Sequence, residues 1–231
     1  MRWVAILIVM LPIWAAGQNM GRYPFAVTPT AGGSECATSR WEFDNSDLDE
    51  NGVNDMTIPS AVYSSSYKIS GTHSLDCSAG SRYSETDNSI SFGSGFFIST
   101  WFLTWATTAS ERTLFTILTS GEDGFDLRYD RNQTRIEFET GDGASNTVAY
   151  STSFTASTGT WYHIAVSVNT TSGVTFFLDG VDVTSSGSLQ SGFSTSGKAR
   201  IGIDWNSGHM SYGFHDHTQW GPFEIDATDA D

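Results

Sequence analysis

The residues best suited to bind an ion stand together in one acidic run, DLDENGVND at positions 47–55. Oxygen-bearing side chains occupy alternate positions, and Gly52 allows the sharp turn that would wrap them around one centre. Hard cations such as Ca²⁺ are bound by several oxygen ligands at once, which this spacing can supply. We therefore predict a calcium site in this run.

This acidic run matches only part of an EF-hand loop. Ile58 stands at the twelfth position, where an EF-hand carries a bidentate glutamate, so a complete EF-hand is excluded. The remaining pattern resembles the calcium loops of thrombospondin type-3 repeats. This resemblance implies the side chains of Asp47, Asp49, Asn51 and Asp55 as ligands, with the backbone carbonyl of Val53 as a fifth candidate. The alternative is an acidic surface turn without a metal, because Asn-Gly pairs are also common in ordinary turns.

Two groups of residues near the C-terminus have the types needed for catalysis or metal binding. The run EIDATD at 224–229 is similar to the E-h-D-x-x-E motif of retaining glucanases, but it ends in Asp229 and little chain follows it to build a cleft. His215 and His217 would share one face of a strand and could chelate a transition metal, yet no third ligand is evident. Surface histidines are the alternative. Because no nucleophile–base pattern is recognisable either, we predict that the protein is not an enzyme.

The elements that must position these residues are predicted to be β-strands. Short apolar runs recur about every ten residues and are separated by turn-forming residues. The predicted strands include residues 114–118, 125–129, 135–139 and 147–150. Even spacing of short strands is typical of two-sheet sandwiches and jelly rolls.

The stretch 159–184 gives the clearest strand pattern. Residues 161–168 alternate between two faces, and residues 169–173 have the composition of a hairpin loop. Asp179-Gly180, a strong signal for a tight turn, directly follows the β-branched and aromatic run 174–178. Three successive antiparallel strands are therefore predicted.

The motifs of this stretch, GTWYHIAV and FFLDGV, resemble the laminin-G-like, concanavalin-A-like jelly-roll family. Three further segments fit the resemblance: WEFD at 41–44, FFISTWF at 96–102 and the closing segment 212–225, although His215 and His217 depart from the family pattern. The resemblance implies an all-β fold, an antiparallel two-sheet jelly-roll sandwich. It places the domain at residues 38–231.

Composition limits the partners of such a domain. Its 231 residues suit one large β-domain with short appendages. The chain has 11 Lys and Arg against 26 Asp and Glu, a net charge of −15. This balance argues against nucleic acid or an anionic membrane as partner, because both require clustered basic residues.

The N-terminus predicts export. Residues 1–17 have a positive start, an apolar run and small residues before a cleavage site after Gly17, so we expect a signal peptide and no membrane insertion after its removal. Residues 18–37 form an extended N-terminal segment. A terminal segment of this composition is typical of a disordered linker, and the alternative is that its apolar centre, residues 23–27, pairs with a sheet edge.

Cysteine usage agrees with export. The chain has two cysteines, Cys36 and Cys77, an even number in a secreted chain. A disulfide between them is predicted, and closing a loop of this size would stabilise the fold by roughly 4 kcal/mol. Two free buried thiols are the alternative.

Two functions remain from different classes. The first is a secreted module at the cell surface or outside the cell that recognises a glycan or an extracellular protein, with calcium support and with Trp205 and Trp220 as rim aromatics that stack on a sugar. The second is a structural subunit of an extracellular filament, sheath or particle, in which residues 18–35 lend a strand to the next copy. Fold alone favours neither function.

Overall fold

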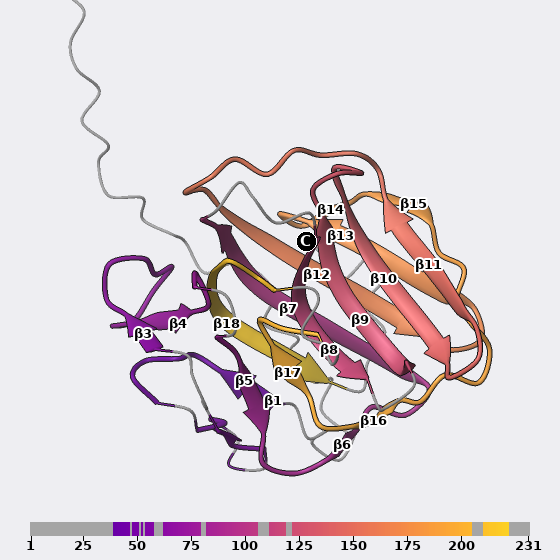
Figure 1. Ribbon diagram of the computed structural model, residues 1–231, viewed down its shortest axis with the longest axis horizontal. Helices are drawn as coiled ribbons and strands as arrows, with labels where there is room; N and C mark the ends of the chain where they lie inside the picture. Colours follow the sequence, from indigo (N-terminus) through magenta and orange to yellow (C-terminus); the bar gives the residue numbers. More distant parts are fainter. Residues whose placement is uncertain are drawn as a thin grey trace, which may run out of the picture.

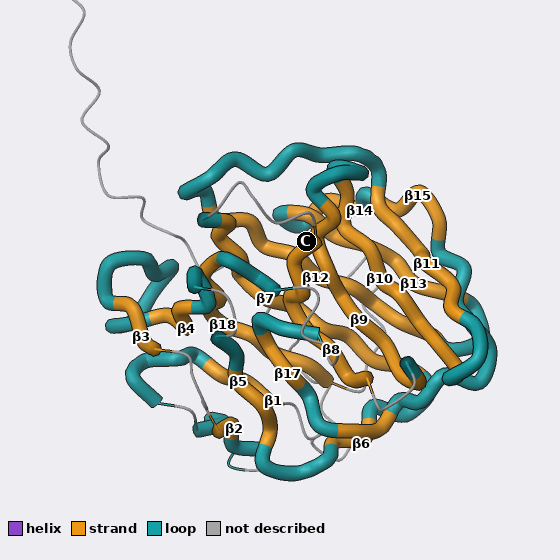
Figure 2. Tube along the Cα trace, viewed as in Figure 1, coloured by secondary structure: helices purple, strands orange, loops and turns teal. Residues whose placement is uncertain are grey.

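The computed structural model describes residues 39–221, apart from 47, 51, 53, 58–61, 80–81, 106–110, 119–121 and 205–209. Every regular element among these residues is a β-strand, as Figure 2 shows. None of the described residues forms a helix that is long and apolar enough to cross a membrane. The predicted domain boundaries at 17/18 and 37/38 lie outside the described residues and stay predictions.

The strands form two large antiparallel sheets that face each other (Figure 1). Sheet A has the order β14 (Val181–Asp182), β13 (Gly173–Leu178), β12 (Trp161–Asn169), β7 (Gly95–Thr104), β18 (Gly213–Gly221), β4 (Ser74–Asp76) and β3 (Val62–Ser64), with β1 (Ser39–Trp41) also paired to β18. Sheet B has the order β15 (Thr184–Ser186), β11 (Asn146–Ser151), β10 (Arg135–Asp142), β9 (Asp123–Asp130), β8 (Glu111–Leu118), β17 (Arg200–Ile201), β5 (Ser84–Thr86) and β2 (Met56–Thr57). A small third sheet pairs β6 (Ile90–Ser91) with β16 (Ser196–Gly197). The predicted antiparallel jelly-roll sandwich is confirmed.

The predicted hairpin of residues 161–178 is confirmed. Strands β12 and β13 pair from Ile164 opposite Leu178 to Asn169 opposite Gly173. The carboxamide oxygen of Asn169 accepts hydrogen bonds from the amides of Thr171 (3.0 Å) and Ser172 (3.1 Å), which closes the loop. Local side-chain chemistry therefore fixes the register of this hairpin.

The next turn is also formed as predicted. Asp179 and Gly180 both have positive φ, 50° and 82°, the backbone geometry of a tight hairpin turn between twisted strands. The Asp179 carboxylate accepts the His163 amide (2.8 Å), so the turn is also tied to β12.

Aromatic side chains fill the space between the two sheets. Phe125 of sheet B lies at the centre, with ring centroids 5.3 Å from Phe96, 5.2 Å from Phe138 and 5.4 Å from Phe92. All four residues are at most 1% exposed. Offset and edge-to-face ring contacts of this kind add to the burial of apolar surface, so this cluster is the main packing of the sandwich.

Charged side chains cover the opposite, outer face of sheet B. Arg128 of β9 donates to Glu137 through Nε (2.9 Å) and also donates to Glu139. Two more carboxylates approach the same guanidinium, Glu111 at 3.7 Å and Asp126 at 3.8 Å. Burial lowers the pKa of Arg128, but the surrounding carboxylates outweigh this effect and raise it, so the side chain stays charged. Arg128 is thus the counter-ion that lets four acids share this face.

The pKa of Asp126 is shifted by its burial among these charged groups. Asp126 is 2% exposed, and its burial raises its pKa to about 8 against the attraction of Arg128. Burial therefore favours the neutral, protonated form of Asp126, and protonation lowers the negative charge around Arg128.

We predict that Arg128→Met destabilises the protein by about 3–5 kcal/mol at pH 7, because removal of one partner leaves buried carboxylates without compensation. The free energy of unfolding from urea denaturation measures this loss. Lys198→Met is the matched control, since Lys198 pairs with Glu85 on the same sheet with a side chain that is 46% exposed. The control should cost about 1 kcal/mol or less. Equal losses in the two variants would contradict the prediction.

Candidate ligand-binding site

The acidic run at 47–55 forms a tight turn whose described side chains bind the backbone. Asp49 is 3% exposed, and its carboxylate accepts the amides of Arg40 (2.9 Å) and Asn54 (3.1 Å). Asp55 in turn accepts the Asp49 amide (3.0 Å). Gly52 has φ 69° and donates its amide to the Asp49 carbonyl, so the predicted turn at Gly52 is present.

Only two of the five predicted calcium ligands, Asp49 and Asp55, are among the described residues. Asp47, Asn51 and Val53 lie outside the described residues. Among the residues that are described, no three His, Cys, Asp or Glu side chains are grouped so that they could hold a metal ion. The donor types still suit a hard cation, and the calcium site stays a proposal.

The prediction that Trp220 stacks on a sugar is wrong. Trp220 is 5% exposed, because it lies on the inner face of β18 opposite Ile98, and its ring centroid is 4.2 Å from that of Phe92. A ring inside the core offers no face to a ligand. Trp205, the other predicted residue, lies outside the described residues.

The predicted disulfide is not tested. Cys77 is a buried free thiol in the structure, and burial raises its pKa. Its predicted partner, Cys36, lies outside the described residues.

A different tryptophan is exposed. Trp105 directly follows β7, is 43% exposed, and is anchored by its amide, which donates to the Tyr212 carbonyl (3.0 Å). Two rings support it: Tyr67 at 4.7 Å and Phe214, edge to face, at 5.9 Å between centroids. Tyr67 also contacts Phe214 at 4.7 Å. We call these three residues the aromatic cluster.

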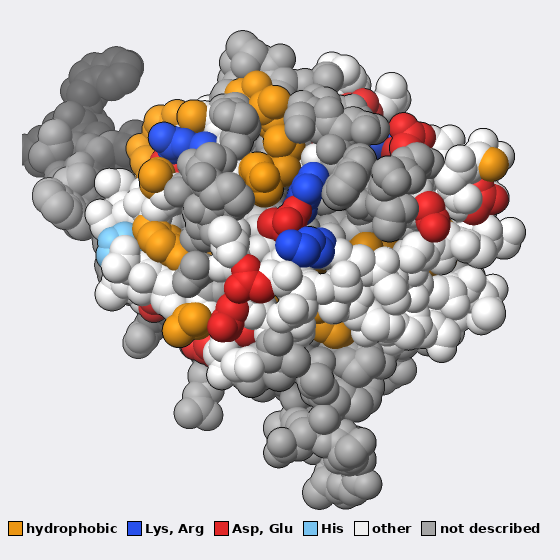
Figure 3. All heavy atoms as spheres, turned by 60° about the horizontal axis from the view of Figure 1, so that its bottom comes forward, with side chains coloured by type: hydrophobic (Ala, Val, Ile, Leu, Met, Phe, Trp, Pro, Cys, Tyr) orange, Lys and Arg blue, Asp and Glu red, His pale blue; other side chains and the backbone are white. Residues whose placement is uncertain are grey.

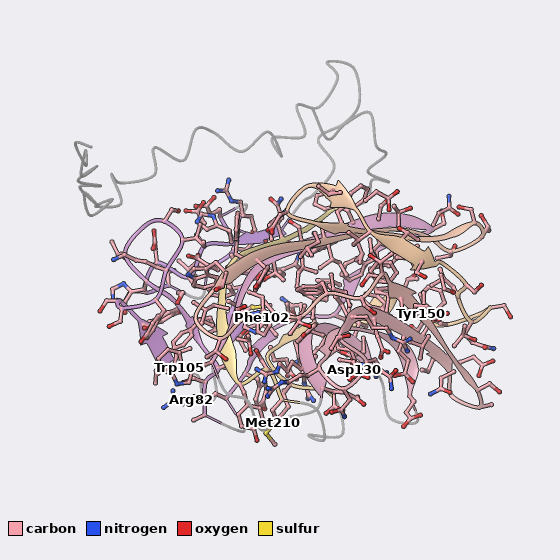
Figure 4. The ribbon with its side chains drawn as sticks, turned by 90° about the horizontal axis from the view of Figure 1, so that it is seen from above. Arg82, Phe102, Trp105, Asp130, Tyr150 and Met210 are labelled. Carbon is pink, nitrogen blue, oxygen red and sulfur yellow. The ribbon has the colours of Figure 1, made fainter. Side chains whose placement is uncertain are left out.

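Charged groups lie beside the aromatic cluster. Asp76 of β4 stands opposite Phe214 in the sheet register. Its carboxylate binds Arg82 Nη1 at 2.7 Å, and Figure 4 shows Arg82 near Trp105 at the same end of the molecule. Lys68 is exposed and donates to two carbonyls of the loop that carries Tyr67, at 3.2 and 3.4 Å. An exposed indole with hydrogen-bonding groups beside it has the composition typical of ligand-binding sites.

Sequence reasoning missed this cluster for a physical reason. Tyr67, Trp105 and Phe214 come from three distant parts of the chain and meet only because β18 pairs with both β4 and β7. The available signal was the place of Trp105, directly after a long apolar strand and before a run of small polar residues.

His215 and His217, which the sequence offered as a possible metal-chelating pair, do not share one face of the strand. The register of β18 against β7 shifts between Asp216 and Gln219, and His217 has φ 45°. This bulge points the two imidazoles to opposite faces of sheet A. His215 is fully buried against Phe102, with Nε2 at 2.6 Å from Ser211 Oγ, so it is not the surface histidine of the alternative interpretation either.

His217 instead lies among polar groups on the outer side. Its Nε2 is 2.5 Å from Ser70 Oγ, and its Nδ1 is 3.5 Å from Glu42 Oε1. This order of hydroxyl, imidazole and carboxylate is that of a nucleophile and its base. However, Arg40 Nη2 also lies 3.5 Å from Nδ1, and a guanidinium can only donate. Donation from Arg40 would leave the proton on Nε2, opposite to what a general base needs, so the arrangement does not support catalysis.

Opposite charges neighbour each other on the surface as well. Figure 3 shows basic and acidic side chains side by side at the centre of one face, with hydrophobic side chains around them. Glu85, for example, binds both Arg200 (2.6 Å) and Lys198 (3.1 Å). Several described basic residues are thus paired with acids, among them Arg128, Arg200 and Lys198.

Comparison with known families identifies the superfamily of the chain. Residues 78–219 match the family model described as the concanavalin A-like lectin/glucanases superfamily. The chain belongs to this superfamily. No curated protein sequence matches it significantly.

Solved structures with a similar fold include botulinum neurotoxin domains. The receptor-binding domain of type G aligns with a TM-score of 0.62 and 11% identity, covering 85% of this chain and 50% of that one. The type D ligand-binding domain in complex with N-acetylneuraminic acid gives 0.62 and 14%, covering 83% and 48%. The DC binding domain in complex with rat synaptotagmin II gives 0.60 and 12%, covering 84% and 50%.

This likeness shows the fold and no more. Identities of this order leave ligand residues unconstrained. The present chain also spans only about half the length of those neurotoxin domains, so the ligands of the neurotoxins are not assigned to this chain.

We predict that His215 makes stability fall at low pH. Burial lowers the pKa of His215 to about 3, below its ordinary 6.5, so the neutral form is favoured in the folded state. The stability that the fold gains by burying a neutral His215 is fully present above pH 6.5. It is lost as the pH falls toward 3, because the unfolded chain then binds a proton that the folded state does not. Relative to wild type, His215→Phe should gain about 2 kcal/mol in unfolding free energy between pH 6.5 and 5.

Urea denaturation at pH 7.5 and pH 5.0 measures this change. Comparison with wild type is essential, because burial raises the pKa of Asp126 to about 8 and that of Asp216 to about 7, which stabilises the fold as the pH falls. His73→Phe, at a half-buried position, is the matched control. The same pH response in both variants would contradict the assignment to His215.

Proposed function

We propose that this protein is a secreted, non-catalytic recognition module that binds glycan on the aromatic cluster of Tyr67, Trp105 and Phe214. The observation that carries the proposal is the 43% exposure of Trp105, with Tyr67 and Phe214 holding its ring in place. An indole that is fixed before binding loses little conformational entropy when a ligand stacks on it. The apolar C–H face of a sugar suits the ring, and the sugar hydroxyls suit Arg82, Asp76 and Lys68 at its rim.

The superfamily and its structural neighbours support this class of ligand. The matched family model is named for lectins and glucanases, and one similar domain is a complex with N-acetylneuraminic acid. A protein ligand is the alternative partner, since another similar domain is a complex with synaptotagmin II. The geometry favours glycan, because the exposed aromatic surface is small and rimmed by charged groups, whereas a stable protein interface buries about 800 Å² on each partner.

Export is part of the proposal. A positive start, an apolar run and small residues make residues 1–17 a signal peptide, and a recognition module for glycans acts outside the cell or at its surface. An acidic chain with a net charge of −15 would stay soluble there.

We predict that Trp105→Ala weakens glycan binding at least tenfold, because loss of a stacked, largely desolvated indole costs on the order of 1.4 kcal/mol or more. A glycan array identifies the best ligand, and isothermal titration calorimetry then compares the dissociation constants of variant and wild type. The thermal midpoint should change little, because Trp105 is half outside the fold.

Val181→Ala is the matched control, since Val181 is 64% exposed at the far edge of sheet A and should leave affinity unchanged. If no glycan binds, or if Trp105→Ala binds as tightly as wild type, this site is not the glycan site.

We also propose that calcium binds the loop at residues 47–55 and supports the neighbouring structure. Calorimetry should detect one site with a dissociation constant near 10⁻⁴–10⁻³ M, the range of extracellular calcium modules. Asp47→Asn with Asp55→Asn should abolish this heat, and Glu122→Gln, in a turn of sheet B, should not. At a calcium concentration 100 times the dissociation constant, bound calcium should stabilise the wild type by about 2.7 kcal/mol. An equal thermal midpoint in calcium and in EDTA would contradict the site.

A structural subunit is the second candidate function, favoured by one observation. Both edge strands of sheet A carry an exposed valine, Val62 at 45% and Val181 at 64%, and open strand edges can pair with another chain. Sedimentation of the mature chain in calcium and in EDTA separates the candidates. Polymers would favour an extracellular filament, sheath or particle, whereas a monomer in both conditions favours recognition.

A further inference from the structure

The outer face of sheet A is apolar and buried, although it lies on the outside of the two-sheet sandwich. Phe97 and Leu103 of β7, Ala165 of β12 and Phe177 of β13 point to this face and are at most 3% exposed. None of the four belongs to the core cluster between the sheets. They form a second apolar surface that the sandwich core does not explain.

This surface is continuous across the middle of the sheet. Ala165 stands opposite Phe177 on one side and opposite Ser99 on the other. Leu103 stands opposite Trp161 and Phe214. Polar members of the face are buried too, including His163 at 7% and Ser167 at 2%. Four neighbouring strands therefore share one covered face.

No strand of the described chain lies over it. The small sheet of β6 and β16 contacts β8 of sheet B. Residues 65–73 cover one end, where Tyr67 contacts Phe214 and the Ile69 amide donates to Asp216 (2.8 Å). Phe97, Ala165 and Phe177 lie on the same face beyond that loop. An apolar face of this kind is stable only if water is excluded from it, so it calls for a cover.

We propose that residues 18–38 of the same chain dock on this outer face as a third layer. The segment enters at the right place, because Ser39 pairs with Trp220 and the next residue of β18, Gly221, stands opposite Phe97. Its length suffices: 21 extended residues reach about 70 Å, whereas four strands spaced about 4.8 Å apart span less than 20 Å.

Composition also selects this segment. Its centre, YPFAV at 23–27, offers two aromatic rings and two aliphatic side chains, and only Arg22 and Glu35 are charged between 18 and 38. The C-terminal residues 222–231 include Glu224, Asp226, Asp229 and Asp231, which would be costly to bury on an apolar face. Docking on the face differs from pairing with a sheet edge, because an added edge strand would not cover Phe97 or Ala165.

Trypsin cleavage after Arg22 tests the proposal in the mature chain that starts at Gln18, with mass spectrometry as the readout. Docking should make this cleavage slow. Phe25→Asp with Val27→Asp should release the segment, speed cleavage at least tenfold and increase binding of an apolar dye. Thr28→Asp with Thr30→Asp is the matched control, because it adds the same charge at polar positions and should leave both readouts unchanged.

Three outcomes would overturn the proposal: fast cleavage in the wild type, equal cleavage in both double variants, or protection that is lost on dilution. The last outcome would mean that a second copy supplies the segment. Urea denaturation of each variant shows that the sandwich itself is still folded. The test is independent of glycan binding, since it reads only the N-terminal segment.

Discussion

The structure depends on one constraint, the position of β7 in the middle of sheet A. It pairs with β12 from Gly95 opposite Asn169 to Leu103 opposite Trp161, and with β18 on its other edge. Its side chains are apolar toward the core and largely apolar on the opposite face as well, so both faces must be covered. A strand that is buried on both faces and hydrogen-bonded on both edges cannot shift its register without exposing apolar surface or breaking hydrogen bonds.

The candidate binding site lies at the C-terminal end of β7. Trp105 is the first residue beyond β7, so its backbone position is fixed by the sheet while its ring projects past it. Strand β18 brings Phe214 to the same point, and the bulge in β18 then turns His217 away from the core. A rigid sheet thus presents one exposed aromatic residue, which is how a binding site can be preorganised without a flexible loop.

The outer faces of the two sheets carry different kinds of buried side chains. Sheet B places acids around Arg128, and burial raises the pKa of Asp126, which favours its neutral form and so reduces the repulsion between the acids. Sheet A carries apolar side chains that require a cover, for which we propose the N-terminal segment. The difference is chemical: a charged face is stable only if its charges are paired, whereas an apolar face is stable only if water is excluded.

The sequence by itself determined the local structure. Alternation in 161–168, the loop at 169–173 and the Asp179-Gly180 turn predicted the central hairpin, because side-chain period and turn chemistry are local properties. Family resemblance extended this to the jelly-roll fold. Only the tertiary structure decided which side chains face solvent. Trp220 lies within β18 and Trp105 directly follows β7, and the pairing of these strands places Trp220 in the core and leaves Trp105 exposed. Likewise, a bulge in β18 places His215 and His217 on opposite faces of the sheet. Alternation in the sequence predicts two faces, but it predicts neither a register shift nor which face another segment covers.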